Sequence, residues 1–138
     1  MSKYNNKNVK LDGHVFDSKA EGDYYSGLKV RQAAGEITSF ELQPRFNLQP
    51  AFIKNGKKFV AITYSADFMV YLPNGDVEVV DIKGMITETF AVKRKMFEYR
   101  YPHLQLILLK HVKKYGGFIT LEEYNKLKRE EKKLKQAR

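Results

Sequence analysis

The clearest alternation of apolar and polar positions lies in the middle of the chain, where two short strand patterns flank a turn. Residues 68–72 and 77–82 are rich in apolar, β-branched and aromatic side chains, which favour strands. Between them, Pro73 suits the first central position of a type I turn, and Gly75 can take the left-handed conformation that follows. The pattern predicts a β-hairpin with a three-residue loop, Pro73-Asn74-Gly75.

The length of this loop decides which side chains share a face of the hairpin. With three residues in the loop, counting outward along both strands places Asp67 directly opposite Asp81, with Lys83 further along the same face. A two-residue turn of Asn74-Gly75 is the alternative. It shifts the register by one residue and turns Asp81 to the face opposite Asp67. We favour the longer loop because its first residue is proline.

Two carboxylates directly opposed on a sheet repel each other, so a neutralising partner is expected. A divalent cation would serve, helped by Lys83. Magnesium prefers oxygen ligands and commonly uses one or two carboxylates, and Mn²⁺ can substitute for it. The chain has no cysteine and only 3 histidines, with no metal-binding spacing, so zinc is not expected. The alternative is a solvated strand face on which Asp67 and Asp81 only prevent aggregation.

Helix and strand patterns alternate along the rest of the chain, from a strand or hairpin at residues 9–16 to a final helix. We expect a helix at 19–34, a strand at 38–48, and strands within 51–64 that are joined by a turn at Asn55-Gly56. A helix from Thr87 or Glu88 to before Pro102, a buried strand at 104–110 and a helix after Thr120 are expected to follow. These elements predict an α/β (α+β) fold, with a mixed central sheet of four to five strands flanked by helices in the order αβββαβ plus a C-terminal helix. We expect one domain over residues 1–138, with a flexible arm at 1–8 and a basic helix at 120–138.

Residues 77–84 read Val-Glu-Val-Val-Asp-Ile-Lys-Gly, and residues 64–68 read Tyr-Ser-Ala-Asp-Phe. Together they resemble the core signature of the PD-(D/E)XK nuclease superfamily, with Asp67 as the first acid and Asp81-x-Lys83 as the second half. The likeness extends over roughly residues 14–110 and is strongest to a phage-type branch that includes Holliday junction resolving endonucleases. One departure is alanine in place of the usual proline before the first acid. The resemblance implies a restriction-endonuclease-like core.

The resemblance also implies a site and a function. Asp67, Asp81, the main-chain carbonyl of Ile82 and Glu21 would hold Mg²⁺, with Lys83 catalytic beside them. The implied activity is magnesium-dependent hydrolysis of DNA phosphodiester bonds in DNA recombination, selective for branched DNA such as Holliday junctions and carried out by a homodimer. The alternatives are another repair, recombination or nicking nuclease of the same superfamily, and a non-catalytic basic DNA-binding module.

Glu21 has two explanations. In the stretch Ser18-Lys19-Ala20-Glu21 it fits a capping box, in which Ser18 caps the helix and Glu21 reaches back to the amide of Ser18. Helical spacing also places Glu21 on the same side as Tyr25 and Leu28, which is expected to pack on the sheet. A carboxylate there needs compensation, and the resemblance suggests that it completes the acidic cluster. Glu21 can serve both purposes.

An excess of basic residues indicates a polyanionic partner. The chain has 25 Lys and Arg against 16 Asp and Glu, a formal charge of +9. The candidate DNA-binding residues are Lys19, Gln43, Lys93, Arg94, Lys95 and Arg100. Lys93 and Lys95 lie about 160° apart on a helix, so only one of them can face the site.

The final helix is strongly basic, with seven basic and two acidic residues between Lys126 and Arg138. It is either a solvated helix docked by its first two turns, a DNA backbone contact or part of a dimer interface. No stretch is apolar enough to span a membrane, residues 1–10 lack a signal-peptide core, and no Gly-rich phosphate loop indicates a nucleotide cofactor. We therefore expect a cytoplasmic protein, and the resemblance implies a phage or bacterial origin.

Overall fold

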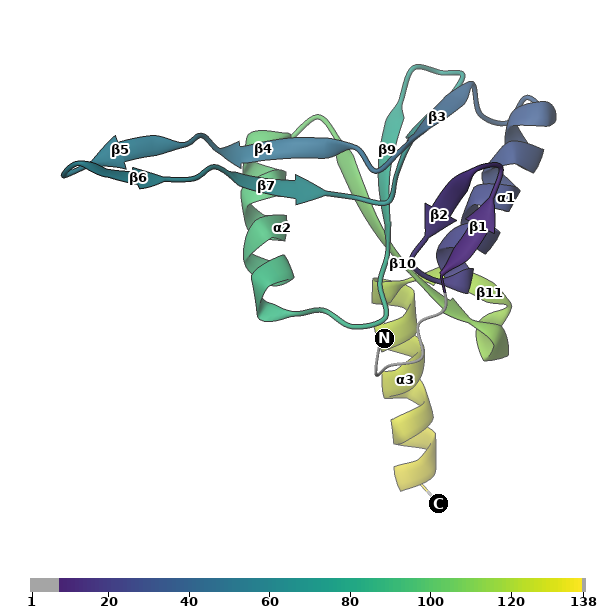
Figure 1. Ribbon diagram of the computed structural model, residues 1–138. Helices are drawn as coiled ribbons and strands as arrows, with labels where there is room; N and C mark the ends of the chain where they lie inside the picture. The colour runs from purple at the N-terminus through teal and green to yellow at the C-terminus, as the bar shows by residue number, and fades with distance from the viewer. Residues whose placement is uncertain (1–7, 138) are drawn as a thin grey trace.

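A mixed sheet of five strands forms the centre of the molecule, in the order β11-β10-β9-β8-β3 (Figure 1). The computed structural model describes residues 8–137. The strands are β3 (Ser39–Leu42), β8 (Phe68–Tyr71), β9 (Val77–Ile82), β10 (Gln105–Val112) and β11 (Gly117–Thr120). β9 and β10 run parallel, and the other neighbours run antiparallel. The fold is therefore of the predicted α+β class.

Different helices bury the two faces of this sheet. Helix α1 (Lys19–Ala33) packs on one face, where Leu28 joins a cluster with Val80. Helix α2 (Glu88–Arg100) packs on the other, where Phe97 joins a cluster with Val79. Because successive residues of a strand point to opposite faces, β9 contributes to both clusters and is buried between the helices. The elements α1, β3, β8, β9, α2 and β10 have the predicted order αβββαβ.

The central hairpin has the predicted register. Phe68 pairs with Val80, and the amide of Leu72 donates to the carbonyl of Asp76 at 2.9 Å, which closes a three-residue loop. Gly75 has a φ of 94°, the left-handed conformation that glycine adopts without strain. The two-residue alternative is therefore wrong.

A long two-stranded ribbon is inserted between β3 and β8 and projects from the body (Figure 1). Its base is β4 (Arg45–Gln49) paired with β7 (Ile62–Ser65), and its outer part is β5 (Phe52–Lys54) paired with β6 (Lys57–Phe59). The prediction of one continuous strand at 38–48 is wrong. The chain breaks at Gln43-Pro44 into β3 and β4, which belong to different sheets. Gln43 has a φ of 49°, outside the strand region, and Pro44 has no amide to donate.

The remaining elements lie around this core. Hairpin β1 (Val9–Leu11) and β2 (His14–Phe16) packs against α1, where a Cβ on Gly22 would lie 3.2 Å from Val9. Strand β11, which the sequence patterns did not indicate, follows a short 3-10 helix, η1 (Lys113–Tyr115). Helix α3 (Leu121–Gln136) is capped by Thr120, as predicted. The expected arm at 1–8 lies, apart from Asn8, outside the described residues.

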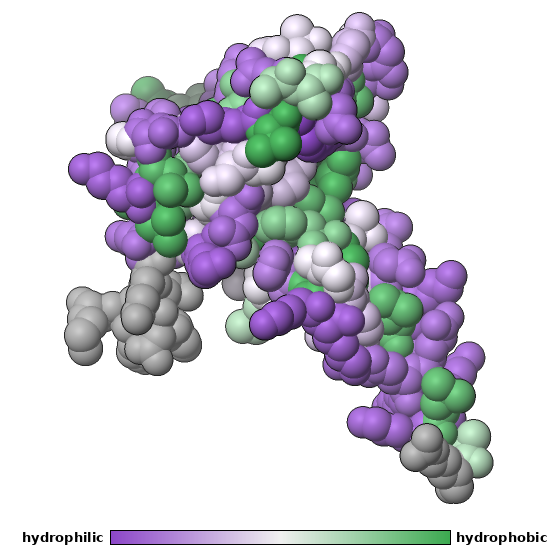
Figure 2. All heavy atoms as spheres, turned by 90° about the vertical axis from the view of Figure 1, so that its right-hand side faces the viewer, coloured by the Kyte–Doolittle hydropathy of each residue, from purple (hydrophilic) through white to green (hydrophobic). Residues whose placement is uncertain are grey.

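Helix α3 is docked along its first three turns, as far as Glu131. Its Leu121 packs against the core, and the remainder extends away from the body with a largely hydrophilic surface (Figure 2). The ammonium of Lys114 lies 2.6 Å from the carboxylate of Glu131, which also accepts a hydrogen bond from Tyr115. No helix in the described part of the chain has the length and apolar character needed to cross a membrane.

Candidate metal and catalytic site

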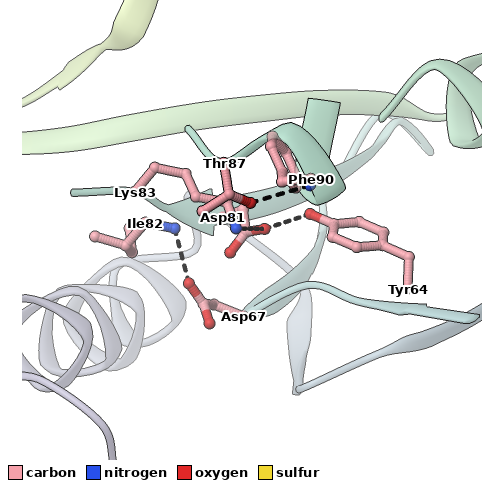
Figure 3. Close-up of polar contacts among 7 residues, drawn as sticks. All are labelled: Tyr64, Asp67, Asp81, Ile82, Lys83, Thr87 and Phe90. Carbon is pink, nitrogen blue, oxygen red and sulfur yellow. Dashed lines mark hydrogen bonds and ion pairs between the residues drawn. The ribbon is translucent and has the colours of Figure 1, made fainter. Parts of the chain in front are cut away.

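Side chains from three consecutive strands meet at the end of β9 (Figure 3). Asp81 is the fifth residue of β9 and Lys83 follows that strand. Asp67 immediately precedes β8, and Tyr64 comes from β7 at the base of the ribbon. The hairpin turn fixes the register of β8 and β9, and the ribbon delivers the tyrosine from a separate sheet.

Asp67 is held by its main chain and its side chain. Its amide donates to the carbonyl of Val80 at 3.1 Å, and its carbonyl accepts from the amide of Gln43 at 2.9 Å. Its carboxylate Oδ2 accepts from the amide of Ile82 at 2.7 Å. The regular ladder ends at Phe68, so Asp67 lies one residue beyond it and the directly opposed pairing with Asp81 is not formed. The two carboxyl groups are nevertheless close enough to shift each other's pKa.

Asp81 is the buried charged residue of the core, with 3% of its surface exposed. Its Oδ2 accepts a hydrogen bond from the hydroxyl of Tyr64 and lies 3.1 Å from the ammonium of Lys83 (Figure 3). The Lys83 ammonium in turn lies 4.0 Å from the ring centroid of Phe90, the third residue of α2. The carboxylate, ammonium and aromatic ring fix one another's positions.

Burial is the main cause of the unusual pKa values of the two aspartates. Burial and then the neighbouring Asp67 raise the pKa of Asp81 to about 7, although the Tyr64 hydroxyl and the Lys83 ammonium lower it. Burial also raises the pKa of Asp67 to about 6, with a further increase from Glu21 and an opposing effect of its hydrogen bonds with Asp81 and Ile82. The pair therefore retains a proton near neutral pH unless a cation replaces it.

Glu21 forms part of the expected capping box, and its carboxylate lies near the aspartate pair. Its amide donates to Ser18 Oγ at 3.2 Å, which confirms the N-terminal cap of α1, and the Ser18 hydroxyl donates to its carboxylate at 3.1 Å. Its carboxylate also lies beside that of Asp67 and lines a pocket with Gln43 and His14. Glu21 thus adjoins the aspartate pair from the side of α1.

The described residues contain no group of three or more His, Cys, Asp or Glu side chains arranged to hold a metal ion. The candidate ligands are therefore two carboxylates, with Glu21 beside that of Asp67. This oxygen donor set fits a magnesium ion that keeps several waters, because such ions commonly use one or two carboxylates together with substrate phosphate oxygens. It does not fit zinc, which needs nitrogen or sulfur ligands.

The structure separates the predicted DNA-binding residues. Lys93 lines a pocket with Lys83, Tyr64 and Thr87, whereas Lys95 lies in a different groove. Lys93 is therefore the member of that pair that faces the site. Lys95 and Arg100 line the groove at the base of the ribbon, Arg94 lines a pocket beside β10, and Lys19 is exposed and paired with Asp23 at 2.9 Å.

The site residues all lie within one stretch that matches a protein family. Residues 1–117 match the family described as Protein of unknown function (DUF1064). The chain belongs to this family. No curated protein matches the chain. The whole of α3 lies beyond the stretch that matches DUF1064.

Tyr64 is the site residue of this DUF1064 chain that sequence reasoning missed. The stretch at 64–68 contained it, but only Asp67 was given a role there. The feature that could have indicated its role is the alternation of residues in β7, which makes Tyr64 the buried residue between half-buried Thr63 and exposed Ser65. A buried tyrosine normally finds a partner for its hydroxyl, and here that partner is a carboxylate.

Proposed function

We propose that this chain is a magnesium-dependent endonuclease that hydrolyses DNA phosphodiester bonds, with a restriction-endonuclease-like core. The observation that carries the proposal is the pair of half-buried Asp67 and buried Asp81, with the Lys83 ammonium 3.1 Å from Asp81. When both carboxyl groups are ionised, one ammonium leaves one negative charge unbalanced, so a divalent cation can replace the proton that the pair otherwise holds. The order of the core elements agrees with the fold that the resemblance implied.

Asp67 and Asp81, with the carbonyl of Ile82 and with Glu21 at one side, would hold Mg²⁺ or Mn²⁺. When bound, the cation would polarise the scissile phosphate and lower the pKa of an attacking water. The protein's own groups have separate tasks. Lys83 places a compact positive charge where negative charge develops on the phosphate, and Lys93, in the same pocket, is placed to contact a neighbouring phosphate.

Tyr64 and Phe90 would position these groups. The Tyr64 hydroxyl donates to Asp81, and burial raises the pKa of Tyr64 above its usual value, so it stays a donor at every working pH. Phe90 places its ring against the Lys83 ammonium and so limits the directions in which that side chain can point. Both residues act on the orientation of a charged group.

The proposed substrate is branched DNA such as a four-way junction, in the interior of a phage-infected or bacterial cell. A charge of +9 supports a polyanionic substrate, and the absence of cysteine suits a reducing compartment. Recognition of DNA shape would explain a basic surface without an evident base-reading element. Two symmetric cuts would require two sites, so we propose a homodimer.

A non-catalytic DNA-binding module is the second candidate. It is favoured by the finding that, among the described residues, no three His, Cys, Asp or Glu side chains are arranged to hold a metal ion, although Glu21 lies beside Asp67. In this case the basic surfaces would bind DNA and the aspartate pair would only be a buried polar contact.

One assay separates these functions. The full chain would be incubated with junction, flap, single-stranded and linear duplex DNA, with magnesium or with a chelator. We expect magnesium-dependent cleavage, with the highest kcat/KM on the junction. Asp81→Asn is expected to lower the cleavage rate by at least a hundredfold. Lys83→Arg is also expected to be damaging, because a planar guanidinium does not reproduce a compact ammonium.

Asp76→Asn is the matched control, because it removes a carboxylate at the exposed end of the same hairpin. It should leave cleavage within a factor of two. Cleavage that survives Asp81→Asn would show that the assignment is wrong. Binding without cleavage of any of the four substrates would identify the non-catalytic module.

A further inference from the structure

The outer part of the ribbon has an unusual composition. Residues 44–66, which contain all of its strands, include Arg45, Lys54, Lys57 and Lys58 and no aspartate or glutamate. Every side chain of β5 and β6 is exposed. These include apolar ones, and Ile53 is 74% exposed. An exposed element that is both apolar and uniformly basic is costly unless a partner covers it.

The pairing of β5 with β6 gives the ribbon a defined face. Phe52 pairs with Phe59, and their rings stack at a centroid distance of 4.8 Å with an angle of 9° between the planes. Lys54 pairs with Lys57 two positions further on, and strand alternation places both on the same face as the aromatic pair. Directly opposed lysines repel each other, so this tip favours an anion that lies across both.

The charge of the ribbon selects among possible partners. A second copy of the same ribbon would bring like charges together, and Lys58, opposite Ile53, adds a third positive charge at the tip. Duplex DNA complements both properties, because its phosphates are regularly spaced and its grooves admit two-stranded ribbons and accept apolar side chains against thymine methyl groups or between base steps. We propose that the β5–β6 ribbon is an arm that binds double-stranded DNA. Lys54, Lys57 and Lys58 contact phosphates, and the exposed apolar side chains lie in a groove.

The arm is connected to the candidate site by continuous chain. Tyr64 follows Lys57 by seven residues, so the tip lies at most about 25 Å from the site's tyrosine. This distance is less than one turn of duplex DNA, about 34 Å. At the base of the ribbon, Lys95 and Arg100 line a groove with exposed Tyr99, which continues the basic surface toward α2. One duplex can therefore contact both the arm and the site.

The first test measures binding in a chelator, so that it does not depend on cleavage. The triple variant Lys54→Ala, Lys57→Ala, Lys58→Ala is compared with wild type on a fluorescent duplex at several salt concentrations. The matched control is Lys132→Ala, Lys133→Ala, Lys135→Ala on α3, which also removes three exposed lysines. We expect the arm variant to raise Kd at least tenfold at low salt. The slope of log Kd plotted against log salt concentration should fall by about 2 to 3, because each lost phosphate contact lowers this slope by roughly 0.9.

An unchanged Kd and salt slope in the arm variant would overturn the proposal. An equal loss in the arm and α3 variants would also overturn it, since the effect would then reflect net charge and not the arm.

The second test uses the absence of cysteine from the chain. Ile53→Cys carries an environment-sensitive dye at the arm, and Val30→Cys carries it on α1, where the native side chain is 69% exposed. Adding duplex should change the emission of the arm label and leave the α1 label unchanged. An arm signal that responds to protein concentration without DNA, with a dimer in sedimentation, would identify self-association and overturn the proposal.

The inference rests on the proposed function only for the choice of DNA as partner. If the protein binds duplex through the arm but cuts no substrate, the arm stands and the nuclease is excluded. If it cuts DNA and the arm variant binds with wild-type Kd, the nuclease stands and the arm is excluded.

Discussion

Tyr64 shows how one hydroxyl can determine the behaviour of a buried acid. Its hydrogen bond to Asp81 favours the charged carboxylate and lowers the pKa of Asp81, against the larger effect of burial. The Lys83 ammonium acts in the same direction from 3.1 Å. Without these two donors, a carboxylate that is 3% exposed would be protonated over a wider pH range and less able to bind a cation.

Tyr64→Phe removes this hydroxyl and keeps the ring. We expect the pKa of Asp81 to rise, so the ascending limb of the cleavage pH profile should move to higher pH. Loss of such a supporting partner typically costs roughly tenfold or more in activity. Tyr101→Phe is the matched control, because its hydroxyl donates to the carbonyl of Asn47 at 3.0 Å in an exposed place. A profile that does not move in Tyr64→Phe would contradict the positioning role.

At the scale of elements, the β8–β9 hairpin sets the positions of both acids through its turn. The three-residue loop requires a left-handed residue at Gly75, where φ is 94° and a Cβ would meet no neighbouring atom. Any penalty for a side chain at this position is therefore backbone strain and not a clash. Gly27, in the middle of α1, also has open space but a helical backbone.

The same substitution at these two glycines should have opposite effects on stability. Gly75→Ala should lower the free energy of unfolding by about 1 to 2 kcal/mol, because an L-residue is strained in the left-handed region. Gly27→Ala should raise it by roughly 0.5 to 1 kcal/mol, because alanine favours the helix and restricts the unfolded chain. Urea denaturation of both variants measures the difference. If both variants changed the free energy of unfolding in the same direction, left-handed backbone strain would not explain the need for glycine at position 75.

At the scale of the whole molecule, the two aspartates couple folding to pH. Their pKa values of about 6 and about 7 lie above the ordinary 3.8. Between pH 4 and pH 7 the native protein therefore holds protons that the unfolded chain has released. The contribution of the pair to the free energy of unfolding is greatest at acidic pH and falls as the pH rises through this window.

Urea denaturation in a chelator between pH 4.5 and 8 should show this contribution. We expect a decline of roughly 3 to 5 kcal/mol, since the two pKa values lie about four units in total above pH 4.5 and one pKa unit corresponds to about 1.4 kcal/mol at most. Magnesium at pH 8 should restore much of the loss, because a ligand that binds only the native state stabilises it. Asp81→Asn should flatten the decline, and Asp76→Asn should not. Stability that rises with pH in the chelator would contradict the pKa directions.

Local patterns in the sequence determined much of the fold and of the site. Ser18 and Thr87 cap the two helices that flank the sheet. Pro73 and Gly75 specify the turn between β8 and β9, and the register of these strands could be predicted by counting residues outward from the turn. These features depend on neighbours a few positions apart, so they can be derived from order and residue type alone. Helical spacing showed that only one of Lys93 and Lys95 could face the site, and the structure places Lys93 in the pocket with Lys83.

Only the tertiary structure decided which distant side chains meet. The break at Gln43-Pro44 sends β4 out of the central sheet, and the ribbon that results carries Tyr64 to Asp81. Burial of Asp81 between the packed elements, which raises its pKa, also depends on the complete core. Such contacts join segments that are far apart in the sequence and meet only when the whole chain has folded. Periodicity specifies the exposed and buried faces of each element, but the partner of each face is chosen when the elements pack together.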